Sequence, residues 1–225
     1  MFNGKERKMA RMSSGLKDTL NGNVYNGIIG LVLLWGFIVN VLIVHFYSDV
    51  FMAMNPWTLI IGYFISCIIG IIMAVKSSNP IISFIGYNLV VVPVGAVLSV
   101  ALQGYSSVDI KSAFLATGGI TAVMMISTTV FPKFFAGLGR TLFFSLLFGI
   151  IAELICMLFG IAAPIFNWIF VVIFSLYIGY DWYKAQSYPK TVDNAVDSAL
   201  DIYLDIIISL LDFLKSLVSL MTNIT

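Results

Sequence analysis

The chain has 225 residues, of which 60% are hydrophobic and only 10% are charged, with a formal net charge of +1. A soluble domain averages about 25% charged residues, so a soluble fold of this size could not hide so much apolar surface from water. The composition excludes an ordinary soluble domain, gives no reason to expect nucleic-acid binding, and indicates a protein whose main solvent is lipid.

Seven stretches are long and apolar enough to cross a bilayer, whose hydrocarbon core of about 30 Å needs roughly 20 helical residues. No connection between them is long enough to separate two domains. We therefore predict an all-α polytopic membrane protein with a single domain, residues 1–225, in which a basic cytoplasmic segment (1–24) precedes a seven-helix bundle (25–222). The predicted spans are Tyr25–Tyr47, Pro56–Val75, Pro80–Leu102, Ile110–Phe131, Leu138–Phe159, Ala162–Tyr180 and Ser198–Met221.

The connections are short and contain turn-forming residues. The fifth and sixth spans are predicted to meet at Gly160, because glycine accepts the backbone conformations of tight turns. The other predicted connections are Ser48–Asn55, Lys76–Asn79, Gln103–Asp109, Pro132–Gly137 and Asp181–Asp197.

Basic residues are unevenly distributed along the chain. With a cytoplasmic N-terminus, only Lys111 and Lys215 of the twelve Lys and Arg residues fall on the outer side. An excess of Lys and Arg on cytoplasmic segments sets membrane orientation, so we predict a cytoplasmic N-terminus and, after seven spans, a C-terminus outside. The short chain favours a bacterial plasma membrane, and an internal membrane of a eukaryote stays open.

The seventh span carries acids that hydropathy alone would place on an amphipathic helix at the membrane surface. Asp193, Asp197, Asp201 and Asp205 follow each other at i, i+4 and so form one stripe along the helix. An interfacial helix usually presents Lys and Arg on its polar face, and this one presents acids. We therefore predict an inserted helix whose acidic stripe faces a wet cavity.

Asp181 and Asp205 are the strongest candidates for a functional site. An acid at membrane depth costs about 2.5–3.5 kcal/mol on insertion scales, so it is read as functional by default. The 181–197 connection would let the last two spans run antiparallel and bring the acids together. Two carboxylates in a low dielectric share one proton and titrate as a unit, and Ca²⁺ can replace that proton because carboxylate oxygens are hard ligands. The alternative is that each acid only caps a helix end near water.

The C-terminal part of the chain carries a recognisable pattern. Gly179-Tyr180-Asp181 is followed by a polar-rich stretch and then by Ala199-Leu200-Asp201-Ile202-Tyr203-Leu204-Asp205-Ile206-Ile207. This resembles the signature of the Bax inhibitor-1 family, in which Tyr/Phe-Asp ends the sixth helix and a Leu-Tyr-Leu-Asp-type motif lies in the seventh. Phe114–Met124 and Pro132–Gly139 are similar to the family's fourth helix and the loop that follows it.

The resemblance implies a seventh helix at the centre of the bundle and a pH-sensitive calcium leak pathway, with Ca²⁺ and protons as the ions and no other cofactor. It implies that Asp181 and Asp205 form a hydrogen-bonded dyad that senses protons and Ca²⁺. It also implies a basic residue near the dyad from the end of the second helix, where this chain offers Lys76 in place of the expected Arg. After Asp181 the chain reads Trp182-Tyr183-Lys184, which departs from the family's common Asp-Thr-Gln pattern.

Five further residues are candidates for accessory roles. Asp197 and Asp201 lie on the acidic stripe. Glu153 in the fifth span is either a second station on a cation path or a protonated group bonded to a neighbouring helix. Pro93, with Gly95 close behind it, interrupts the third span and predicts either a hinge or an ordinary kink.

Three other functions stay open, and one of them is enzymatic. Intramembrane aspartyl proteases pair Tyr-Asp with Gly-x-Gly-Asp, but the second motif here is Tyr203-Leu204-Asp205 and lacks both glycines. We therefore predict a protein that is not an enzyme. A regulator of cell death or membrane-protein quality control that acts through helix contacts, and a proton/Ca²⁺ exchanger, are the non-enzymatic alternatives.

Overall fold

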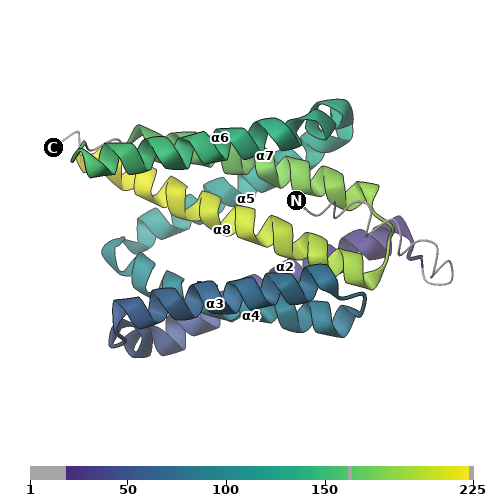
Figure 1. Ribbon diagram of the computed structural model, residues 1–225, viewed down its shortest axis with the longest axis horizontal. Coiled ribbons are helices and arrows are strands. Elements are labelled where there is room, and N and C mark those ends of the chain that lie inside the picture. The colour runs from purple at the N-terminus through teal and green to yellow at the C-terminus, as the bar shows by residue number, and fades with distance from the viewer. Residues whose placement is uncertain (1–18, 162–163, 223–225) are drawn as a thin grey trace. The chain divides into compact units, whose positions relative to one another are not determined.

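The computed structural model describes residues 19–161 and 164–222, and within these ranges all regular structure is helical (Figure 1). Most of the basic segment predicted for residues 1–24, and Ala162 at the start of the predicted sixth span, lie outside the described residues. The elements are α2 (Gly22–Met52), α3 (Pro56–Lys76), α4 (Pro80–Ala101), the 3₁₀ turn η1 (Leu102–Gly104), α5 (Ser107–Val130), α6 (Pro132–Leu158), α7 (Ile165–Ser187) and α8 (Val192–Thr222).

Short sequence signals set where several helices begin and end. Asn55-Pro56 and Asn79-Pro80 start α3 and α4, with proline in the first turn and the Asn side chain accepting a backbone N–H two residues on. Ser106 starts α5 through a capping box with Asp109. Gly160, with φ of 67°, supplies the left-handed residue just after α6, as the predicted turn there requires.

Three predicted connections are wrong. The predicted 48–55 connection shrinks to residues 53–55, because α2 continues to Met52. Residues 132–137 form the first turns of α6, because Pro132 occupies an opening helical position where its missing N–H costs nothing. The predicted 181–197 connection shrinks to residues 188–191, because α7 continues to Ser187 and α8 already begins at Val192. Thr191 caps that start by accepting the N–H of Asn194 at 3.1 Å.

The helices form two compact units. The first contains the chain up to Gly104 together with Ala185–Asp201, and the second contains Tyr105–Lys184 together with the chain from Ile202 onward. The helix α8 therefore contributes its first turns to one unit and the rest to the other.

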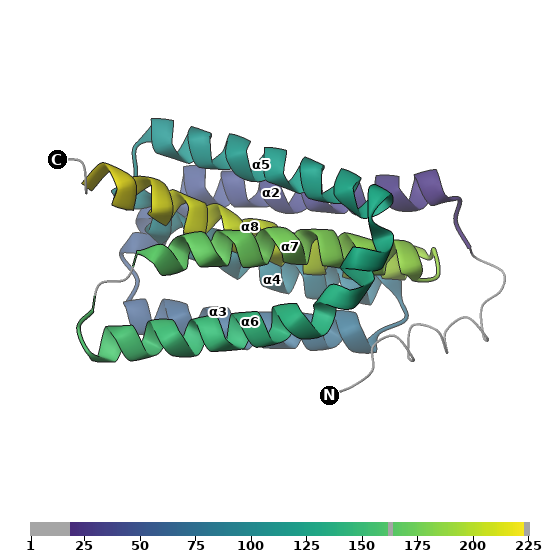
Figure 2. The same ribbon diagram turned by 90° about the horizontal axis from the view of Figure 1, so that it is seen from above.

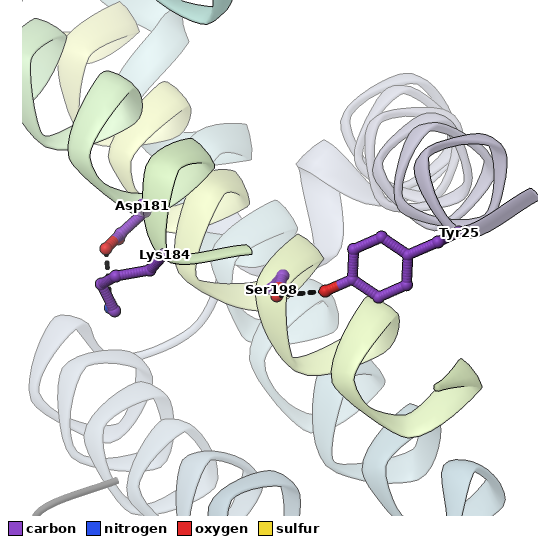
Figure 3. A network of polar contacts seen from close by, with 4 residues as sticks. All are labelled: Tyr25, Asp181, Lys184 and Ser198. Atoms are coloured by element: carbon purple, nitrogen blue, oxygen red, sulfur yellow. Dashed lines mark hydrogen bonds and ion pairs between the residues drawn. The ribbon is translucent and has the colours of Figure 1, made fainter. Parts of the chain in front are cut away.

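In the first unit α4 packs against both α2 and α3. Gly70 and Gly86 face each other so closely that a Cβ on Gly70 would lie 2.5 Å from the Gly86 carbonyl oxygen. Small residues of this kind let membrane helices approach closely. Tyr25 of α2 contacts the first turns of α8, since its hydroxyl lies 3.3 Å from Ser198 Oγ (Figure 3). The same hydroxyl lies 3.1 Å from the Ala185 carbonyl near the end of α7.

The second unit is built from α5, α6, most of α7 and the rest of α8. A tight corner at Phe131 joins α5 to α6 (Figure 2). Phe170, Ile173 and Phe174 of α7 form an apolar cluster, against which Leu146 of α6 and Ile208 of α8 pack. Of the four acids of the stripe, Asp205 lies in the same unit as Asp181 of α7.

Six described helices, α2 to α7, are long and apolar enough to cross a membrane. Their exposed side chains include many large apolar residues, as expected of surfaces in contact with lipid: Leu31, Phe46, Trp57, Leu115 and Phe148 are examples. The helix α8 has 31 residues but is not one of these six helices. It differs from them in carrying many acidic residues. It is buried on its polar side, at Asp193, Asp197 and Asp205, and also on its apolar side, at Ala199, Ile202 and Ile206.

Candidate functional site

Asp181 lies inside α7 rather than at its end, because the helix continues for six more residues to Ser187. Only 8% of its surface is exposed. One turn further along the same helix, Lys184 Nζ donates to Asp181 Oδ1 at 2.7 Å (Figure 3). A buried carboxylate is thus paired with a cation from its own helix, which offsets part of the cost of burying its charge.

Close packing by α5 and α6 fixes the backbone just before Asp181. The ring of Phe135 in α6 lies directly over Gly179, so that a Cβ at position 179 would overlap it. The Thr128 hydroxyl near the end of α5 has two acceptors for its one hydrogen, the Met124 carbonyl of its own helix at 2.9 Å and the Gly179 carbonyl at 3.1 Å. The helix that carries Asp181 is therefore held by two neighbours at a point two residues before the acid.

Tyr180 completes this packing. Its ring lies against Gly139 of α6, where a Cβ would overlap the phenol. The ammonium group of Lys184 lies 5.3 Å from the centre of the same ring, within the range of a cation–π contact. The partners of Lys184 therefore include the Asp181 carboxylate and the Tyr180 ring.

Asp205 lies on α8 within the second unit and is 7% exposed. The hydroxyl of Tyr177 in α7 experiences the charge of Asp205 most strongly and that of Asp181 next, with Tyr180 and Lys184 also contributing. The half-buried Tyr177 hydroxyl is therefore influenced by the charges of both carboxylates. The role of the two acids as a sensing dyad stays a prediction at this point.

The residues around the two acids bear on metal binding. Among the described residues, no three or more His, Cys, Asp or Glu side chains gather closely enough to hold a metal ion. Ca²⁺ takes six to eight oxygen ligands.

The comparison with known families agrees with the C-terminal motif. The family model described as "Inhibitor of apoptosis-promoting Bax1" matches residues 18–221, which is nearly the whole chain. The chain belongs to the Bax inhibitor-1 family. The predicted resemblance is confirmed, and family membership with six apolar helices identifies a multi-pass integral membrane protein. No curated protein matches the chain significantly.

Three of the candidate accessory residues of this Bax inhibitor-1 family member lie in the first unit. Asp197 is buried on α8, and its charge acts on the Tyr25 hydroxyl. Asp201 is half-buried one turn further along α8. Lys76 is the last residue of α3 and is exposed. Its predicted approach to the acid pair stays a prediction.

Glu153 is exposed on α6, in the second unit. Its charge acts on Asp212 of α8, an acid that is itself bound by Lys215 at 3.1 Å. Both predicted roles of Glu153, as cation station and as structural group, stay open.

Pro93 and Gly95 lie within α4, which is continuous from Pro80 to Ala101. At Gly95 a Cβ would come within 2.8 Å of Ile43 Cδ1 and 3.0 Å of Asn40 Oδ1 on α2. Gly95 therefore has a packing role, which is the close approach of α2 and α4. A hinge at Pro93 stays a prediction.

Sequence reasoning missed Lys184 and Tyr177, which surround Asp181 most directly. Their spacing from Asp181, i+3 for Lys184 and i−4 for Tyr177, places all three on one face of a helix. The spacing of Lys184 indicates a contact with Asp181 only if the helix is predicted to continue past Asp181.

Proposed function

We propose that this Bax inhibitor-1 family protein is a pH-sensitive calcium leak pathway, controlled by an Asp181–Asp205 carboxylate pair that exchanges a shared proton for Ca²⁺. The observation that carries the proposal is the burial of both acids in one helical unit, within electrostatic range of the Tyr177 hydroxyl. Buried acids in membrane helices are costly to keep unless they have a function.

The chemistry follows from the low dielectric around the pair. Two ionised carboxylates in such a place repel each other strongly, so the pair holds one proton when no other cation is bound. Ca²⁺ can take the place of that proton because its two charges match those of two ionised carboxylates. Whether a proton or Ca²⁺ is bound between the two carboxylates then determines how strongly α7 and α8 are linked.

The same proposal includes seven spans, with α8 inserted as the central one. Its burial on both polar and apolar sides supports insertion, because a helix lying on a membrane surface would keep its polar side in water. The distribution of Lys and Arg supports a cytoplasmic N-terminus and an outer C-terminus.

Flux through reconstituted protein tests the proposal. The purified chain is placed in liposomes loaded with a Ca²⁺-sensitive dye, and entry of Ca²⁺ is followed over a series of pH values. We expect a flux that varies with pH and that loses its pH response in Asp181→Asn and in Asp205→Asn. Asp49→Asn, which neutralises an exposed acid at the end of α2, serves as the control and keeps the response. Absence of flux at every pH would refute the leak.

A second candidate function is favoured by the family description, which names inhibition of an apoptosis-promoting protein. A regulator of cell death would bind another membrane protein through exposed apolar helix faces, without moving ions. Absence of flux, together with wild-type stability of the Asn variants, would favour this function. An imposed proton gradient that drives Ca²⁺ uphill would instead identify a proton/Ca²⁺ exchanger.

A further inference from the structure

We propose that Lys184 is a tethered cation that occupies Asp181 and must be displaced before Ca²⁺ can bind the acid pair. This inference rests on the proposed function and assigns a residue that sets the affinity of the pair for Ca²⁺. It concerns Lys184 because that side chain is bound directly to one of the two carboxylates.

Lys184 and Asp181 form a direct ion pair. Lys184 Nζ lies 2.7 Å from Asp181 Oδ1, which is the short distance of a charge-assisted hydrogen bond. The two residues are separated by one helical turn, so the contact needs no rearrangement of other elements. The Asp181 carboxylate therefore has a bound cation that belongs to the chain itself.

The charges of the two carboxylates, Lys184 and Ca²⁺ determine how the two cations compete. Two ionised carboxylates carry two negative charges, which match one Ca²⁺ ion. With the Lys184 ammonium in contact with Asp181, an arriving Ca²⁺ meets a positive charge already bound to one of the two carboxylates. Lys184 and Ca²⁺ therefore compete for the same carboxylate, and removal of the ammonium strengthens Ca²⁺ binding.

The Tyr180 ring gives the displaced ammonium a place to stay. Lys184 Nζ already lies 5.3 Å from the centre of that ring, and its side chain is 28% exposed, so it has room to move. The ring itself is fixed against Gly139 of α6. The ammonium can therefore leave Asp181 and keep its contact with the ring, which lowers the cost of the exchange.

Calcium titration of the full chain in detergent tests this competition, with Ca²⁺ alone as the probe and thermal stability as the readout. In Lys184→Met we expect the Ca²⁺ concentration for half-maximal stabilisation to fall by roughly two- to fivefold, the range for loss of a partly exposed ion pair. Lys184→Arg keeps the charge and stays near the wild-type value. Lys133→Met removes an exposed charge from the start of α6 and serves as the matched control.

The outcomes separate this inference from the proposed function. Damaged folding would not raise the affinity for Ca²⁺. A lower Ca²⁺ concentration for half-maximal stabilisation in both Lys184→Met and Lys184→Gln therefore supports the tethered cation. An unchanged or weaker affinity in both variants overturns it, and loss of the calcium effect in Asp181→Asn would then leave the proposed function standing. Absence of any calcium effect in the wild type and in all variants overturns both proposals.

Discussion

Replacement of Gly179 by Ala tests whether packing by α6 holds the helix that carries Asp181. A Cβ at position 179 would lie 2.9 Å from both Cδ1 and Cζ of Phe135 and closer still to a third ring atom. Real Cβ atoms do not approach other carbons so closely. Phe135 is 2% exposed, so the ring cannot swing into open space, and α6 and α7 must separate instead.

The expected cost can be isolated with a matched variant. Gly137, two residues after Phe135 in α6, has nothing within 4 Å of its ideal Cβ. Alanine is favoured over glycine in a helix by about 1 kcal/mol, and both variants gain this. Only Gly179→Ala suffers the overpacking, which typically costs about 1–3 kcal/mol. We therefore expect Gly179→Ala to be less stable than Gly137→Ala by about 1–3 kcal/mol.

Unfolding in mixed detergent micelles, followed by circular dichroism as denaturing detergent is added, measures this difference. Phe135→Leu should relieve the overlap, so the double variant should lose less stability than the sum of the two single variants. Equal stability of Gly179→Ala and Gly137→Ala, or strict additivity with Phe135→Leu, would refute the packing argument.

Three further variants test other contacts by the same unfolding measurement. Gly70→Ala should destabilise the chain by about 1–3 kcal/mol relative to Gly62→Ala, whose Cβ meets open space in the same helix, and equal stability would contradict the close helix approach. Thr128→Val should cost about 1 kcal/mol through loss of its bond to the α7 carbonyl, and a neutral effect would show that bond to be unimportant. Ser83→Ala should cost about 1.5 kcal/mol, because its hydroxyl donates to the buried Asp193 carboxylate at 2.6 Å, and a gain in stability would be inconsistent with this contact.

The helices themselves were largely predictable from sequence. Apolar stretches of the right length predicted seven spans, and six of them correspond to described helices apolar enough to cross a membrane. Pairs such as Asn55-Pro56 and Asn79-Pro80 predicted two helix starts to the residue. These features are local, since capping and proline geometry depend only on neighbours in the chain.

The helix ends around the acids were less predictable, because hydropathy reports membrane depth and not helix length. Trp182 to Gln186 are polar enough to end an apolar stretch, yet none of them breaks a helix, and α7 stops only before Pro189. Because the predicted helix ended before Asp181, Lys184 was not considered as its partner. The two residues lie one turn apart on the same helix and form an ion pair.

The packing around Gly179 could not be predicted at all. Its neighbours Phe135 and Thr128 lie on two other helices, and nothing in the spacing of these residues along the chain indicates that they meet. Contacts between helices depend on crossing geometry, which sequence periodicity alone does not specify.

The central claim is that Asp181 and Asp205 act as one proton- and Ca²⁺-binding unit. The most direct test compares the pH dependence of Ca²⁺ flux in liposomes for the wild type, Asp181→Asn, Asp205→Asn and the double variant. We predict that either single change removes the pH response and that the double change adds nothing further, because half of a pair cannot share a proton. A pH response that survives in either single variant, or two partial losses that add up in the double variant, would contradict the claim.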